Sequence, residues 1–184
     1  SDETAILAAL GGDADLSSGV LQQDETCLED FIARYVNAFG ANALKGLRLG
    51  VYEHSSVARD VLLKIITALG AEAVRLERAD SFIPVDTEAV EPAMQAKLKG
   101  WASAQGLDAI LSTDGDGDRP MLVDETGKLV PGDKLGVLTA KALGAKMICT
   151  PVSSNTGVAQ MAEFTSVTLT RIGSPYVIAA MEGI

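Results

Sequence analysis

Three short apolar segments alternate with two segments of helical periodicity in the middle of this chain. The apolar segments span residues 47–52, 73–77 and 107–112, and the helical segments span residues 57–69 and 91–105. This order is typical of parallel strands joined by right-handed crossover helices. The sequence therefore predicts an α/β fold with mixed, largely parallel sheets and helices on both faces.

Two further helices are expected before these segments. The first covers residues 2–10, and the second ends at Gly40. Thr26 and Glu29 are spaced as a capping box at the start of the second helix, in which each side chain would bond to the backbone of the other.

A second α/β pattern occupies the C-terminal part of the chain. Asp133 is placed to cap a helix that contains residues 135–143. Strands are expected over residues 146–150 and 167–171, and a turn at residues 173–175 leads into a last helix.

The sequence Asp-Gly-Asp-Gly-Asp-Arg follows the third apolar segment. The carboxylates of Asp114, Asp116 and Asp118 can point at one centre if the backbone curls, and Gly115 and Gly117 permit such a curl. Oxygen ligands of this kind suit Mg²⁺, and without a cation three like charges this close would repel one another. The spacing therefore predicts a magnesium site.

Arg119 ends this run, and residues 120–124 form a short strand after it. Its guanidinium group is a planar, always charged fork that suits a phosphate or a carboxylate. The acidic loop also follows the C-terminal end of a strand, where open α/β sheets bind their ligands. We therefore expect a phosphorylated ligand beside the cation and in contact with Arg119.

Two other interpretations of the acidic run remain open on spacing alone. In an EF-hand calcium loop, the three aspartates would occupy positions 1, 3 and 5 and Glu125 would occupy position 12. Position 6 would then be Arg119 where glycine is required, and the flanks would have to be helices. The run could also be an acidic surface turn that binds no ion.

At these residues the sequence resembles the α-D-phosphohexomutases, the family of phosphomannomutases and phosphoglucomutases. The resemblance rests on the acidic loop at 114–119 and on three further motifs, at residues 123–127, 132–135 and 172–177. It implies phosphoglucomutase-like α/β/α units. It also implies three parts: the end of a first domain with a connecting helix (1–44), a metal-binding second domain (45–125) and the first part of a third domain (126–184).

The resemblance also implies a chemistry. A phosphohexomutase moves a phosphoryl group between O1 and O6 of a hexose phosphate through a phosphoserine and a hexose 1,6-bisphosphate. Mg²⁺ would be held by the three aspartates, Arg119 would act on the phosphoryl group, and Arg171 and Ser174 would bind substrate. The phosphoserine motif and the sugar-reading loops are not recognisable in this sequence, so we expect the chain to need the remaining domains of an enzyme and to be inactive alone.

The turn that contains Ser174 also has a simpler interpretation. Residues 173–175 connect a strand to a helix, and the first amides of a helix are a natural anion site. The same residues would equally suit an ordinary turn with a serine cap and a proline in the first helical turn.

Composition and charge limit the partners. The formal net charge is −10, which argues against nucleic acid and anionic membranes. Cys27 and Cys149 lie in apolar patterns and are expected to be buried thiols in a reducing compartment. We see no signal peptide and no apolar run of membrane-spanning length, so a cytoplasmic location is expected. The neighbours His54 and Ser55 are not expected to be catalytic, because adjacent residues rarely face each other.

Overall fold

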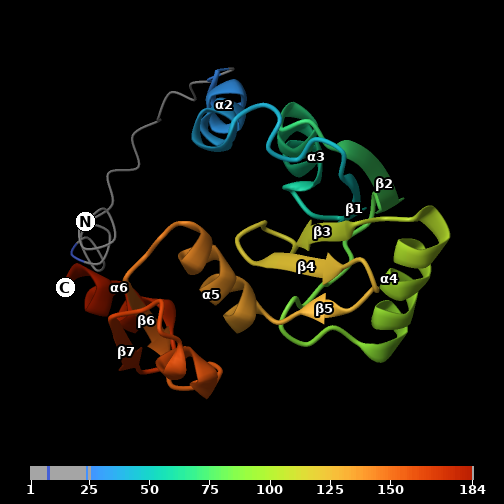
Figure 1. Ribbon diagram of the computed structural model, residues 1–184. Helices are drawn as coiled ribbons and strands as arrows, with labels where there is room; N and C mark the ends of the chain where they lie inside the picture. The colour runs from blue at the N-terminus through green and yellow to red at the C-terminus, as the bar shows by residue number, and fades with distance from the viewer. Residues whose placement is uncertain (1–7, 9–23, 25, 184) are drawn as a thin grey trace.

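The computed structural model describes residues 8, 24 and 26–183, and the helix expected over residues 2–10 lies almost entirely outside this part. The described residues form two sheets, one of five strands and one of two (Figure 1). The elements around the first sheet are α2 (Cys27–Phe39), β1 (Arg48–His54), α3 (Arg59–Ala68), β2 (Glu72–Arg78), α4 (Pro92–Gln105), β3 (Ala109–Thr113), β4 (Pro120–Asp124) and β5 (Leu129–Val130). The elements of the second part are α5 (Gly132–Ala142), β6 (Met147–Pro151), the 3₁₀ helix η1 (Thr156–Gln160), β7 (Ser166–Thr170) and α6 (Ser174–Glu182).

The first sheet has the order β2-β1-β3-β4-β5, with β1 at the centre of its parallel half. Strands β2 and β3 both pair with β1 in parallel, whereas β4 and β5 continue the sheet in antiparallel fashion. The two strands of the second sheet, β6 and β7, are also parallel. The predicted α/β class with mixed, largely parallel sheets is confirmed.

Helices cover both faces of the first sheet because its strands alternate their apolar side chains. Leu49 and Val51 of β1 face α3, where they pack with Ile66. Tyr52 of β1 belongs to the cluster on the opposite face, which includes Leu98 of α4. Successive side chains of a strand point to opposite faces, so β1 contributes to both clusters. Val51 and Tyr52 are fully buried, which makes β1 the common core of the two layers.

Two predicted helix caps are wrong. The Thr26 hydroxyl donates to the side chain of Asp24 at 2.8 Å and makes no cap bond, so the capping box does not form. Helix α5 begins after Pro131, and Asp133 lies in its first turn. The Asp133 carboxylate accepts instead from the backbone amide of Asn155 at 2.9 Å, which ties α5 to the segment after β6.

The expected burial of the cysteines is wrong for Cys27, and Cys149 is not fully buried either. Cys27 is exposed and Cys149 is half-buried, and both are free thiols. Helix α2 ends at Gly40, as predicted, yet Phe39 at its end is 57% exposed. Within the described residues, no helix combines the length and apolar character that a bilayer span requires.

The turn between β4 and β5 approaches α4 so closely that only glycine fits there. Gly127 has a φ of 78°, and a Cβ atom on it would lie 2.4 Å from Cα of Lys99. We predict that Gly127→Ala lowers the free energy of unfolding by about 2 kcal/mol or more, because it adds both backbone strain and a clash with backbone. Chemical denaturation measures this change.

The control is Gly100→Ala on the exposed side of α4, where an added Cβ meets no atom within 4 Å. It should leave stability unchanged or raise it by about 0.5–1 kcal/mol, since alanine favours a helix more than glycine does. Equal stabilities of the two variants would contradict the close approach of turn and helix.

Candidate metal-binding site

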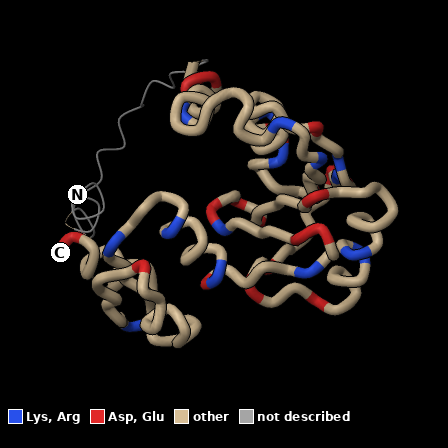
Figure 2. The backbone as a smooth tube through the Cα atoms, in the orientation of Figure 1, with Lys and Arg blue, Asp and Glu red and all other residues tan. Residues whose placement is uncertain are grey.

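The acidic run forms the loop of a β-hairpin. Strands β3 and β4 pair in antiparallel fashion up to Thr113 and Pro120, and residues 114–119 connect them. The Asp114 amide donates to the Arg119 carbonyl at 3.1 Å and closes the loop. In Figure 2 this loop, found from its place in Figure 1, carries an acidic segment with a basic one beside it. The carboxylates therefore lie just beyond the C-terminal end of β3.

The three carboxylates converge as the spacing predicted. One oxygen atom from each of Asp114, Asp116 and Asp118 lies within 4.8 Å of the other two. Two oxygens bound to one Mg²⁺ are at most about 4.2 Å apart, because each lies about 2.1 Å from the ion. A small contraction of exposed side chains would meet that geometry, so the donor set fits a hard divalent cation.

Asp114 shapes the loop as well as contributing to the cluster. Its Oδ1 accepts hydrogen bonds from the amides of Gly117 and Arg119, both at 3.1 Å. Partial burial would raise the pKa of the Asp114 carboxyl, but the hydrogen bonds from the Arg119 and Gly117 amides hold that pKa below its usual value. Asp114 is therefore the aspartate whose carboxylate is held in place by the backbone of the loop.

The neighbouring carboxylates change the pKa of Asp118. Repulsion from Asp116, together with some burial and repulsion from Asp114, raises the pKa of the Asp118 carboxyl. A divalent cation bound between the carboxylates would remove this repulsion, so the loop has an electrostatic preference for a cation.

Only one of the two loop glycines has the backbone conformation that was expected of both. Gly117 has a φ of 87°, and a Cβ atom on it would lie 3.0 Å from Cβ of Ala58. The backbone of Gly115 does not enter the left-handed region, and a Cβ there would meet only the ring edge of Phe82 at 3.3 Å. The curl of the loop therefore depends on Gly117.

The loop is supported by the β1–α3 turn, which comprises residues 55–58. The His54 side chain, at the end of β1, places Nε2 2.9 Å from the Thr113 carbonyl oxygen. The hydroxyl groups of Ser56 and Thr113 are 2.6 Å apart. Both contacts reach the last residue of β3, directly before the first aspartate.

Two more contacts join the same turn to the loop itself. The Val57 amide donates to the Gly115 carbonyl at 3.0 Å. Gly117 packs against Ala58, as its close approach shows. We did not foresee this support from the sequence, although β1 and β3 were both predicted as parallel strands. Neighbouring parallel strands end at the same edge of a sheet. This rule could have indicated that the turn after β1 lies beside the loop after β3.

The structure places the other predicted site residues in two groups. Arg119 is with the carboxylates: its Nε lies 3.9 Å from Asp114, and its side chain is 60% exposed. Arg171 directly follows β7 and Ser174 is the first residue of α6, so the two lie on either side of the turn that follows the second sheet. The Arg171 guanidinium lies over the ring of Tyr176 at 5.6 Å, and Gly173 rather than Ser174 is the N-cap of α6.

The EF-hand interpretation is wrong for this loop. Strands β3 and β4 flank it where an EF-hand has helices. Glu125, which would be the twelfth ligand, lies beyond the full length of β4. A strand of five residues extends about 17 Å, so Glu125 is at the wrong end of the strand to complete the site.

Comparisons with known proteins identify relatives of this chain. The family model described as "Phosphoglucomutase/phosphomannomutase, alpha/beta/alpha domain II" matches residues 29–127, which include the whole acidic loop. The chain is 45% identical over 183 residues to a phosphomannomutase of Sinorhizobium fredii and 43% identical over 182 residues to one of Salmonella muenchen. Each alignment covers 97% of this chain.

The fold also matches a solved structure. The crystal structure of a phosphoglucomutase/phosphomannomutase family protein from Burkholderia thailandensis aligns with 90% of this chain at a TM-score of 0.73 and 19% identity. This chain spans 38% of the Sinorhizobium protein, 37% of the Salmonella protein and 37% of the Burkholderia chain. The family model and the two phosphomannomutase alignments together show that the chain belongs to the phosphoglucomutase/phosphomannomutase family.

Proposed function

We propose that this chain is the metal-binding part of a phosphohexomutase. The enzyme would move a phosphoryl group between O1 and O6 of a hexose phosphate, through a phosphoserine and a hexose 1,6-bisphosphate. The observation that carries the proposal is the convergence of the Asp114, Asp116 and Asp118 carboxylates at the end of β3. The names of the similar phosphomannomutases support the substrate class.

In this proposal the three aspartates hold Mg²⁺, which when bound would neutralise charge on the transferring phosphoryl group. Asp114 is suited to anchor the ion, because amide hydrogen bonds already fix one of its oxygens. Arg119 projects from the same loop with most of its side chain exposed, so its guanidinium group can bind phosphoryl oxygens. Its fixed positive charge would stabilise negative charge in the transition state.

Substrate binding would involve the second sheet. Arg171 and Ser174 stand at the start of α6, where the helix dipole favours an anion. Stacking on Tyr176 restricts the Arg171 side chain, which reduces the entropy lost when it binds a phosphate. We propose that these residues bind the phosphate of the hexose phosphate.

The remaining functions belong to other domains in this proposal. The divisions at 1–44, 45–125 and 126–184 would correspond to the end of domain 1, to domain 2 and to the start of domain 3. The phosphoserine and the sugar-reading loops would come from the remaining domains of a cytoplasmic enzyme of carbohydrate metabolism. This is consistent with the chain spanning 38% of the Sinorhizobium relative.

The metal assignment predicts the effect of removing one ligand. In the enzyme that contains all domains, Asp116→Asn should lower the magnesium-dependent mutase rate by about 100-fold or more, because one charged ligand is lost. The matched control is Glu125→Gln, which removes one exposed charge in the next turn of the chain and should leave the rate within about twofold. A coupled assay of hexose phosphate conversion measures both, and full activity of Asp116→Asn would refute the assignment of the loop.

The two glycines predict unequal effects on metal affinity. Gly117→Ala should weaken Mn²⁺ binding to this chain by about tenfold, because alanine at a φ of 87° adds strain of about 1–3 kcal/mol. Gly115→Ala should change affinity by less than about twofold, since the exposed ring of Phe82 can move. Isothermal titration with Mn²⁺ measures both, and equal losses would contradict the role of Gly117.

The chain alone is predicted to show no mutase turnover. Purified protein of these 184 residues should leave mannose and glucose phosphates unconverted even with added Mg²⁺ and hexose 1,6-bisphosphate. The comparison is the same assay on the enzyme that contains all domains. Turnover by the isolated chain at a comparable rate would overturn the proposed division of labour.

A further inference from the structure

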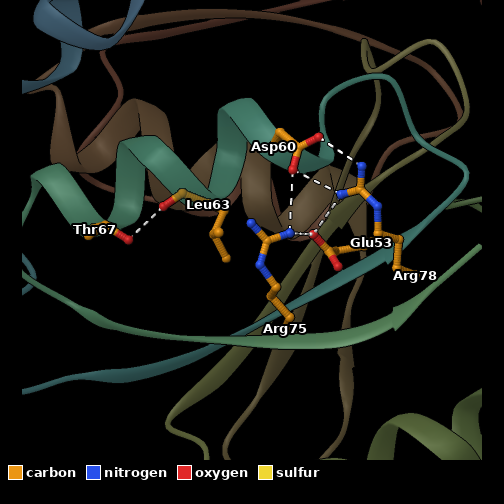
Figure 3. Close-up of polar contacts among 6 residues, drawn as sticks. All are labelled: Glu53, Asp60, Leu63, Thr67, Arg75 and Arg78. Carbon is orange, nitrogen blue, oxygen red and sulfur yellow. Dashed lines mark hydrogen bonds and ion pairs between the residues drawn. The ribbon is translucent and has the colours of Figure 1, made fainter.

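Four charged residues form an ion-pair cluster beside the β1–α3 turn. Glu53 of β1 and Asp60 of α3 both contact Arg75 and Arg78 of β2 (Figure 3). We call these four residues the arginine clamp. Glu53 is only 1% exposed, so its carboxylate depends on these two guanidinium groups for its charge partners.

Arg78 binds in the clamp through a geometry that is specific to arginine. Arg78 binds Asp60 with two nitrogens, Nη1 to Oδ1 at 2.9 Å and Nη2 to Oδ2 at 3.1 Å, and reaches Glu53 at 3.3 Å. Arg75 contacts Glu53 through Nη1, and the same nitrogen lies 3.4 Å from Asp60. Hydrogen bonding to Arg78 is the main reason that the pKa of the Asp60 carboxyl falls to about 2. A lysine at position 78 could supply the charge but not this planar fork, and a lysine at position 75 would keep the charge but place it on a single nitrogen of different reach.

The backbone is adapted to bring both arginines to the same side. Arg75 and Arg78 are three residues apart, so regular alternation along β2 would send them to opposite faces of the sheet. Glu77, between them, has a φ of 38°, which interrupts the alternation. His54 on the paired strand has a φ of 29°. Unusual backbone angles of this kind persist only where the surrounding contacts hold them.

The two acidic residues of the clamp lie on either side of the β1–α3 turn. Glu53 precedes it in β1, and Asp60 follows it in the first turn of α3. By holding both, the arginines fix the separation between the end of β1 and the start of α3. That separation sets the position of His54, Ser56 and Val57, which contact Thr113 and the carbonyl of Gly115.

We propose that Arg75 and Arg78 are positioning residues for the metal-binding loop, acting through the β1–α3 turn that they hold between Glu53 and Asp60. The proposal rests on the proposed function in one respect: the loop must bind a cation for its position to matter. Neither arginine touches the carboxylates of the loop in the contacts described above. Their effect on metal binding is therefore indirect, through the backbone of residues 54–58.

The test uses three substitutions of arginine by lysine in the full chain, all of which conserve charge. Arg78→Lys and Arg75→Lys alter the clamp. Arg48→Lys is the matched control, because Arg48 pairs with Glu72 across the same two strands at the opposite end of the sheet. The first measurement is Mn²⁺ affinity from the electron paramagnetic resonance signal of free Mn²⁺, at a temperature where every variant is fully folded.

We expect Arg78→Lys to weaken Mn²⁺ binding by about tenfold, the lower end of the effect of groups that orient metal ligands. Arg75→Lys should weaken it in the same direction, and Arg48→Lys should leave it unchanged. The second measurement is hydrogen exchange of the Val57 amide, which bonds to the Gly115 carbonyl. Exchange at this amide should be faster in both clamp variants and unchanged in Arg48→Lys. A general loss of stability would instead speed exchange at many amides.

The outcomes separate the positioning role from the metal site. If the unaltered chain binds Mn²⁺ and the clamp variants bind it equally well, the positioning role is overturned and the metal site stands. If the unaltered chain binds no Mn²⁺, the proposed function falls, and the positioning role falls with it. If Arg78→Lys does not fold, Arg75→Lys decides between the first two results.

Discussion

Three carboxylates within 4.8 Å of one another repel, and the loop can hold them there only because other contacts oppose that repulsion. Part of the opposition is local, since amides of the loop bond to Asp114 and the hairpin closes behind it. The rest comes from outside the hairpin, through the β1–α3 turn. Without a cation the loop is therefore an arrangement under electrostatic stress, and the surrounding structure bears that stress.

Strand β1 makes this support possible. Among the described residues, it is the only strand with a parallel partner on each side. One of its faces packs against α3, and the other belongs to the cluster that includes α4. Its C-terminal end lies beside that of β3, so the turn that follows β1 meets the loop that follows β3. The same strand provides Glu53 for the arginine clamp and His54 for Thr113. Core packing and site geometry are thus carried by one element.

The sequence predicted the elements well because their signal is local. Apolar periodicity gave the strands and helices of the first sheet, and the spacing of aspartates gave the carboxylate cluster. The errors concern polar groups for which another partner was available, either two residues away, as for Thr26, or far along the chain, as for Asp133. The Thr26 hydroxyl turned to Asp24, and Asp133 bonded to Asn155, because those partners competed with the local cap. The different roles of Gly115 and Gly117 follow from the loop's neighbours, Phe82 and Ala58, which no local pattern reveals.

The dependence of the hairpin loop on the β1–α3 turn limits how modular the site is. The hexapeptide at 114–119 contains every carboxylate of the cluster, which invites its transfer to the tip of another antiparallel hairpin. In this protein, however, the loop takes its shape partly from a neighbouring parallel strand and the turn that follows it. The smallest transferable unit is therefore a parallel strand with its turn, alongside the hairpin. Evolution would be expected to move or duplicate this chemistry as a whole α/β unit, and not as a short motif.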